Sequence, residues 1–183
     1  MRAFISIDVP ELIKREIAAH TAQMKSRCIT PTTAENLHIS VLFMGSIDDS
    51  QLSAAQNALD AISVHDFYIS LGGVEFFDGE NPRVAYIGIN EGAVHIKSIS
   101  DAISASLKGI VRTDGREFIP HLTIARIKGN CGEEIKALKA VSITEGRFKC
   151  DSIKIIESIT GRGIFCSLEL DIIDVAHEKQ RYM

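Results

Sequence analysis

The sequence lacks the cysteine spacing that is typical of a metal site or of a disulfide framework. Its cysteines are far apart, and no two of them form a Cys-x-x-Cys pair. We therefore expect free thiols, the ordinary state of cysteine in a reducing cytoplasm. The four positions are Cys28, Cys131, Cys150 and Cys166.

Long apolar runs are also absent. None approaches the roughly 20 residues that cross a bilayer, and the apolar stretch after Met1 is too short for the core of a signal peptide. The sequence thus predicts a soluble, cytoplasmic protein with no membrane partner. Its 183 residues fit one domain spanning 1–183, built of two intimate lobes, because no linker-like composition divides them.

Strong positive charge is missing as well. The formal net charge is −4 and the isoelectric point is about 5.9, which argues against salt-driven binding along a nucleic-acid backbone. Recognition of a single nucleic-acid end needs only a local basic pocket and stays open. Four histidines share no ligand spacing, so we expect surface positions for them, no metal site and no cofactor. They are His20, His65, His95 and His177.

Hydrophobic periodicity predicts alternating strands and helices, the pattern of an α+β fold. Asp8 and Pro10 supply capping chemistry for a first helix with Leu12 and Ile13 on its apolar side, and Ser50 is the expected N-cap of a second. Glycines from Gly72 onward predict a loop. The predicted strands cover 3–7, 37–43, 67–71, 84–89 and 119–125, with two more around a hairpin turn at 161–163; further helices cover 94–107 and 134–141.

A short repeat stands out against this background. His38-Ile39-Ser40 returns as His121-Leu122-Thr123, 121 − 38 = 83 residues later, each time inside an apolar run that follows a strand and a helix. We interpret this as the duplication of a small α+β lobe. Side chains at i and i+2 of a strand share a face, so each histidine lies beside its hydroxyl. Two imidazoles form an acid and base pair suited to neutral pH.

The repeat and its flanks resemble the two-histidine phosphoesterases, and within them the RNA 2′,3′-cyclic phosphodiesterases, also called 2′-5′ RNA ligases. The similarity covers nearly the whole chain. It includes the opening segment 2–8, the residues around each motif at 35–45 and 118–126, and the segment 82–88. The resemblance implies two pseudo-symmetric lobes of antiparallel sheet, with helices packed outside and the active site in the cleft between them.

The resemblance also implies roles for individual residues. His38 would be the acid that protonates O3′ of the ribose, and His121 the base that activates water. Ser40 and Thr123 would donate to phosphoryl oxygens. Phe43 and Arg126, each five positions after its histidine, would border the substrate pocket. Strict alternation turns both of the latter to the opposite face, so they can contribute only if each strand bulges or twists.

Two departures from the family pattern affect substrate contacts. Ser40 stands where threonine is commoner, which preserves the hydroxyl. The segment 163–168 lacks the Gly-Pro and Tyr that often precede the last strand, so no base contact can be transferred there. The expected reaction is metal-independent opening of a terminal 2′,3′-cyclic phosphate on RNA 3′ ends to a 2′-phosphate by a monomer, with 2′-5′ ligation as its reverse.

Other interpretations remain open at this stage. The chain could be a non-catalytic module that binds RNA ends or nucleotides, although a pure binder has no need of a matched acid and base. It could instead act on a free cyclic nucleotide or an ADP-ribose cyclic phosphate. Either histidine alone would be interpreted as a buried strand residue satisfied by the backbone; the matched pair reverses that preference.

Overall fold

The structure is a computed structural model that describes residues 1–62, 66–79, 81–112, 117–129, 131–144, 146–150, 152–158 and 172–174. Short connections separate most elements, as expected for a compact α+β chain. The elements are β1 (Arg2–Asp8), α1 (Glu11–Ala22), β2 (Ile29–Pro31), the 3₁₀ turn η1 (Ala34–Asn36), β3 (His38–Ser46), α2 (Asp49–Asp60), β4 (Phe67–Phe77), β5 (Val84–Glu91), α3 (Ala93–Ser106), β6 (His121–Ile127), α4 (Gly132–Lys139), β7 (Arg147–Cys150), β8 (Ser152–Glu157) and β9 (Ile172–Asp174).

In the described part of the chain the strands form one sheet of nine, in which every pairing is antiparallel. Its order is β7-β4-β5-β6-β3-β1-β8-β9, with β2 attached to β6. The two His strands, β3 and β6, are therefore neighbours at its centre, where a single residue pair joins them. The predicted α+β class with antiparallel strands is confirmed.

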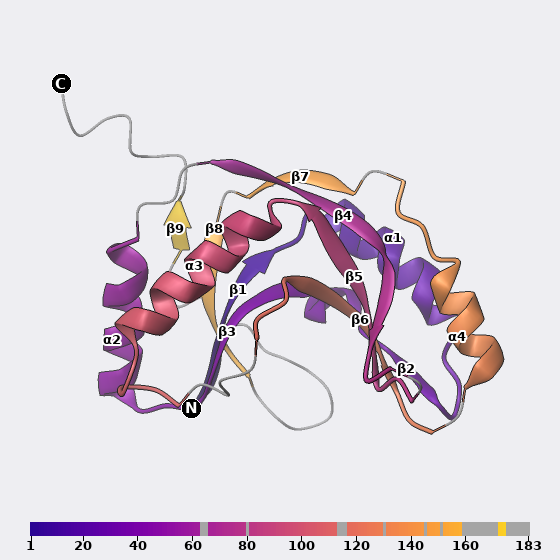
Figure 1. Cartoon of the computed structure of the whole chain (residues 1–183), viewed down its shortest axis with the longest axis horizontal. Coiled ribbons are helices and arrows are strands. Elements are labelled where there is room, and N and C mark those ends of the chain that lie inside the picture. Colours follow the sequence, from indigo (N-terminus) through magenta and orange to yellow (C-terminus); the bar gives the residue numbers. More distant parts are fainter. Residues whose placement is uncertain are drawn as a thin grey trace.

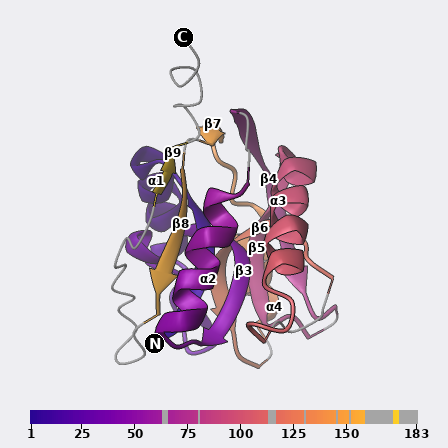
Figure 2. The same ribbon diagram turned by 90° about the vertical axis from the view of Figure 1, so that its left-hand side faces the viewer.

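Among the described residues, four α-helices lie at the periphery of the sheet, with α2 and α3 at one end and α1 and α4 at the other (Figures 1 and 2). α3 follows β5 in the chain but packs on β3, where the Ser100 hydroxyl donates to the Val41 carbonyl at 2.8 Å. α1 follows β1 but packs against β6. A helix from each half of the chain thus packs on the His strand of the other half. Both His strands therefore contribute to one hydrophobic core.

The two predicted helix caps are wrong. α1 begins after Pro10 with no side-chain cap, because the Asp8 carboxylate pairs with lysines instead. The N-cap of α2 is Asp48, which accepts from the Gln51 amide in a capping box, and Ser50 donates to Asp48 at 2.7 Å. Leu12 was expected on the apolar side of α1 but is 81 % exposed, whereas Ile13 and Ile17 are buried.

The strand boundaries also differ from expectation. β4 continues through the glycines that predicted a loop, because register shifts on both sides of Leu71 let Gly72 and Gly73 remain in the strand. The sequence pattern missed β2 and β7, which are three and four residues long. The hairpin turn predicted at 161–163 lies outside the described residues.

The expectation of four free thiols is wrong for two of them. Cys28 and Cys131 are joined by a disulfide, with Cα atoms 6.1 Å apart across a sequence separation of 103. The pairing of β2 with β6 brings these distant positions together, and sequence spacing alone gives no sign of it. Cys150 keeps its thiol and is buried, and Cys166 lies outside the described residues.

No helix in the described part of the chain is long and apolar enough to cross a membrane. Within the same residues, no three His, Cys, Asp or Glu side chains converge as metal ligands would.

Candidate active site

The two His-x-hydroxyl motifs meet at the centre of the sheet. Ile39 of β3 pairs with Leu122 of β6, and both side chains are fully buried. If this antiparallel register is extended by one position to either side, His38 comes across from Thr123 and Ser40 across from His121. Because neighbouring residues of a strand turn to opposite faces, these four polar side chains share the face opposite the buried pair.

A β-bulge follows the first motif. In the pairing of β1 with β3, Ser6 lies opposite Ser40 and Ile5 lies opposite Leu42, so Val41 is the extra residue. The bulge shifts the alternation by one position. Phe43 consequently pairs with Phe4, the same-face neighbour of Ser6, and the two rings lie 5.8 Å apart between centroids.

An equivalent bulge follows the second motif. In the pairing of β5 with β6, Tyr86 lies opposite Thr123 and Ala85 lies opposite Ala125, so Ile124 is the extra residue. Arg126 then pairs with Val84, the same-face neighbour of Tyr86. The two bulges meet the condition set by the sequence: Phe43 and Arg126 come to the face of the histidines, where both are exposed.

The His38 ring is held on two sides. It stacks on Phe4 of β1 with centroids 4.7 Å apart, and it forms a hydrogen bond with the Asn36 backbone. Burial lowers the pKa of His38 to about 4, the Asn36 bond opposes this, and nearby Lys14 lowers it further. Smaller effects come from Asp8, which raises this pKa, and from His121, which lowers it. The two imidazoles are therefore near enough to affect each other's charge.

The His121 ring has a matching environment. Its Nδ1 lies 2.7 Å from the Ile119 carbonyl oxygen, which can only accept, so Nδ1 carries the proton of the neutral ring and Nε2 is left as the basic nitrogen. Phe77 and Tyr86 meet the ring edge-on with centroids 4.9 and 5.2 Å away. Burial lowers the pKa of His121, and the Arg126 guanidinium adds to the effect.

Tyr86 is itself fixed by a carboxylate. Its hydroxyl donates to Glu75 Oε2 at 2.9 Å, and its ring stacks on Phe77 at 4.1 Å. Burial raises the pKa of Tyr86 to about 12, with a further contribution from the bond to Glu75. The phenol therefore stays protonated, and it acts as part of the wall around His121 rather than as a proton donor at neutral pH.

Both imidazoles are neutral in the free protein at pH 7, because each pKa lies below its ordinary value of about 6.5. An anion bound between them would favour the charged form of whichever ring hydrogen-bonds to it. The site therefore suits a reaction in which the substrate carries the negative charge that loads a proton onto one histidine.

Sequence reasoning missed the aromatic walls and the charged group beside His38. Phe4, Ser6 and Asp8 form one face of β1 by simple alternation, and Asp8 pairs with His38 in the register of β1 and β3. The alternation is visible in the sequence, but nothing there identifies β1 as the neighbour of the first His strand. The segment 163–168, where the family's Gly-Pro and Tyr are missing, lies outside the described residues.

Comparison with known proteins agrees with this architecture. The 2′-5′ RNA ligase superfamily matches residues 13–162. An RNA 2′,3′-cyclic phosphodiesterase of Methanocaldococcus jannaschii is 35 % identical over 164 residues, which are 86 % of this chain and 91 % of the relative. One of Aquifex aeolicus is 28 % identical over 172 residues, or 86 % and 88 % of the two chains.

The fold is shared with a solved structure as well. Escherichia coli LigT, crystallised with 3′-AMP, superimposes with a TM-score of 0.77 at 20 % identity, covering 96 % of this chain and 98 % of LigT. Since the family match spans most of the sequence and includes both histidine motifs, the chain belongs to the 2′-5′ RNA ligase superfamily of two-histidine phosphoesterases.

Proposed function

We propose that this protein is an RNA 2′,3′-cyclic phosphodiesterase, which opens a terminal ribose cyclic phosphate to a 2′-phosphate without a metal ion. The observation that carries the proposal is the pair of imidazoles on one face of adjacent strands, each hydrogen-bonded to the backbone two residues earlier in the chain. The relatives from M. jannaschii and A. aeolicus bear the same name for their activity.

The proposed chemistry divides two proton transfers between two rings. His121 takes a proton from water through Nε2, since Nδ1 is occupied by the Ile119 carbonyl. His38 gives a proton to O3′ as the P–O3′ bond breaks. The negative charge of the bound substrate raises the pKa of His38. His38 is therefore protonated in the complex, although it is neutral in the free protein.

Charge on the phosphoryl oxygens also needs partners. Ser40 and Thr123 share the face of the histidines and are proposed to donate their hydroxyls to these oxygens. Arg126, turned to the same face by its bulge, adds a guanidinium near His121. Phe43, which is 59 % exposed beside Phe4, is proposed to border the substrate on the His38 side.

We propose that residues 1–183 form one domain of two duplicated lobes, with the site in the cleft between them and the monomer as the active unit. The two bulges support this, because each follows its motif at the same position. RNA 3′ ends that carry a 2′,3′-cyclic phosphate are the proposed partners. With a 5′-hydroxyl as the nucleophile in place of water, the same opening of the P–O3′ bond would form a 2′-5′ linkage, although the high concentration of water favours hydrolysis.

The test is incubation of the purified protein with a short oligoribonucleotide that ends in 2′,3′-cyclic phosphate. We expect conversion to a ring-opened product that retains one terminal phosphate. An equal sample of the variant with both His38→Ala and His121→Ala controls for contaminating nucleases. Binding of the oligoribonucleotide without conversion would instead support a non-catalytic RNA-end module.

A further inference from the structure

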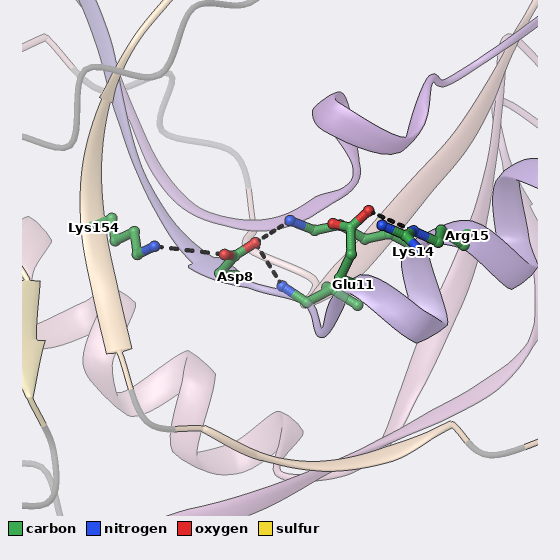
Figure 3. Close-up of polar contacts among 6 residues, drawn as sticks. Asp8, Glu11, Lys14, Arg15 and Lys154 are labelled. Atoms are coloured by element: carbon green, nitrogen blue, oxygen red, sulfur yellow. Dashed lines mark hydrogen bonds and ion pairs between the residues drawn. The ribbon is translucent and has the colours of Figure 1, made fainter.

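A partly buried cluster of opposite charges lies beside His38. Asp8 ends β1, and its carboxylate is shared by Lys14 of α1, which contacts Oδ1, and Lys154 of β8, which lies 3.5 Å from Oδ2. The Val9 amide also donates to Oδ1 at 2.9 Å. Figure 3 shows Asp8 between Lys154 on one side and the first residues of α1 on the other.

Lys14 is unusually enclosed for a lysine. Its side chain is only 12 % exposed, whereas the Asp8 side chain that pairs with it is 42 % exposed. Lysine is seldom buried unless its charge is paired, and the charge of a desolvated ammonium acts more strongly on its neighbours than one in water. Because Asp8 is shared with a second ammonium, it neutralises Lys14 only in part.

The register of the sheet fixes this charge near the candidate acid. Asp8 lies directly opposite His38 in the pairing of β1 with β3, and paired residues of antiparallel strands have Cβ atoms about 5 Å apart. Lys14 is held near His38 as well, because it contacts Asp8. The pKa of His38 responds to both groups, with Lys14 lowering it and Asp8 raising it.

The other histidine has a cation in a comparable place. Arg126 lies on the face of His121, and its guanidinium lowers the pKa of that ring. Each imidazole therefore has one cationic neighbour, supplied by β6 for His121 and by α1 for His38. An anion bound between the two rings would therefore have a cation near each ring.

We propose that Lys14, fixed by Asp8 at the flank of His38, binds the scissile phosphate and is the counterpart of Arg126 on the opposite side of the site. Asp8 is then a positioning residue, which holds Lys14 in place. The assignment rests on the proposed function, since it names a further contact to the same substrate. The simpler alternative is an ion pair that merely fastens α1 to β1.

The experiment compares Lys14→Met and Lys14→Arg with the wild type on a nucleoside 2′,3′-cyclic monophosphate, which carries a single phosphate. A hydrogen bond from a charged donor justifies an expected loss of about 10–100-fold in kcat/KM for Lys14→Met, with most activity kept by Lys14→Arg. Lys97→Met removes an exposed lysine of the ion pair with Asp101 on α3 and is the matched control; its kcat/KM should stay within about twofold, as expected for surface pairs.

A second measurement does not depend on turnover. Inorganic phosphate is titrated into each protein while the imidazole resonances of His38 and His121 are followed by NMR. We expect the shifts at both rings to saturate at higher phosphate concentration in Lys14→Met than in the wild type, and the Lys14→Arg variant to match the wild type. The pKa of His38 in phosphate-free Lys14→Met should rise, because one positive neighbour is removed.

The outcomes separate the two proposals. Phosphate affinity and kcat/KM unchanged in Lys14→Met, in a wild type that is active, would overturn the role of Lys14 and leave the function intact. A wild type without activity would overturn the function, while the phosphate titration still tests Lys14. A defect seen only with longer oligoribonucleotides would assign Lys14 to an internucleotide phosphate and contradict its role at the scissile one.

If Lys14→Met does not fold, Asp8→Asn gives the same test. That variant keeps both lysines but removes the carboxylate that holds them. Its affinity for phosphate should therefore be lower than that of the wild type, although its net charge is more positive. Phosphate affinity equal to or above that of the wild type would contradict a positioning role for Asp8.

Discussion

Phe43 and Arg126 occupy equivalent places in two different strands, and each is turned toward the site by a single extra residue. Val41 bulges from β3 between Ser40 and Phe43, and Ile124 bulges from β6 between Thr123 and Arg126. Without the bulges both side chains would face away from the histidines. The duplicated motif therefore includes a β-bulge as well as its polar residues. In the first copy the bulge turns the Phe43 ring toward the site, and in the second it turns the Arg126 guanidinium.

Arg126→Ala should lower kcat/KM more than Arg126→Lys does. A guanidinium can bind two phosphoryl oxygens at once, whereas an ammonium supplies only a point charge. Steady-state kinetics of both variants on the cyclic-phosphate oligoribonucleotide measures the difference. Equal kcat/KM in the wild type and in Arg126→Ala would make Arg126 an ordinary surface residue.

His38→Ala and His121→Ala should each reduce turnover by roughly 10²- to 10⁴-fold, the usual contribution of a positioned acid or base. The fold should persist, because both rings lie at the partly exposed edge of the core. Circular dichroism of each variant controls for folding. Nearly full activity in either folded variant would exclude a division of proton transfers between the two rings.

Turnover should be unchanged in excess EDTA. The two imidazoles supply both the base that activates water and the acid that protonates the leaving oxygen, so no metal-bound hydroxide is needed. Rates measured before and after chelation test this directly. Activity that is lost in EDTA and restored by a divalent cation would require a different mechanism.

Stability should fall as the pH drops from about 6.5 toward 4. The pKa of His38 is lowered to about 4 by burial, so between these values the unfolded chain binds a proton that the folded protein does not. The contribution is fully present above pH 6.5 and is lost on acidification; for His38 it is on the order of 3 kcal/mol. His121 acts in the same direction.

Urea unfolding of the wild type and of His38→Ala at pH 7 and pH 5 measures this contribution. The variant should lose less stability between the two values, and NMR titration of the wild type should place the His38 midpoint near pH 4. A midpoint near 6.5 would mean that the ring is not desolvated in solution.

The product should be a 2′-phosphate. The departing oxygen must lie opposite the attacking water for in-line displacement, and with His38 beside O3′ the P–O3′ bond is the one that breaks. Phosphorus NMR of the product distinguishes the two isomers, and resistance to a 3′-specific phosphatase provides a check. A predominant 3′-phosphate would mean that His121 is the acid and His38 the base.

The sequence alone determined the local features of this protein. Two His-x-hydroxyl motifs in apolar runs indicated strands with both polar groups on one face, because the two-residue period of a strand is a local property. The same periodicity predicted α3 nearly to its ends, 94–107 against Ala93–Ser106. The motifs and their flanks also indicated the family, which the later comparisons confirmed.

Only the tertiary structure decided which local features meet. The central position of β3 and β6, the bulges at Val41 and Ile124, and the disulfide between Cys28 and Cys131 all depend on pairing between segments far apart in the chain. Asp8 illustrates the reason: its sequence context favours a helix cap, but the folded sheet places it beside two lysines and opposite His38. Burial and long-range charge pairing outweighed the local preference.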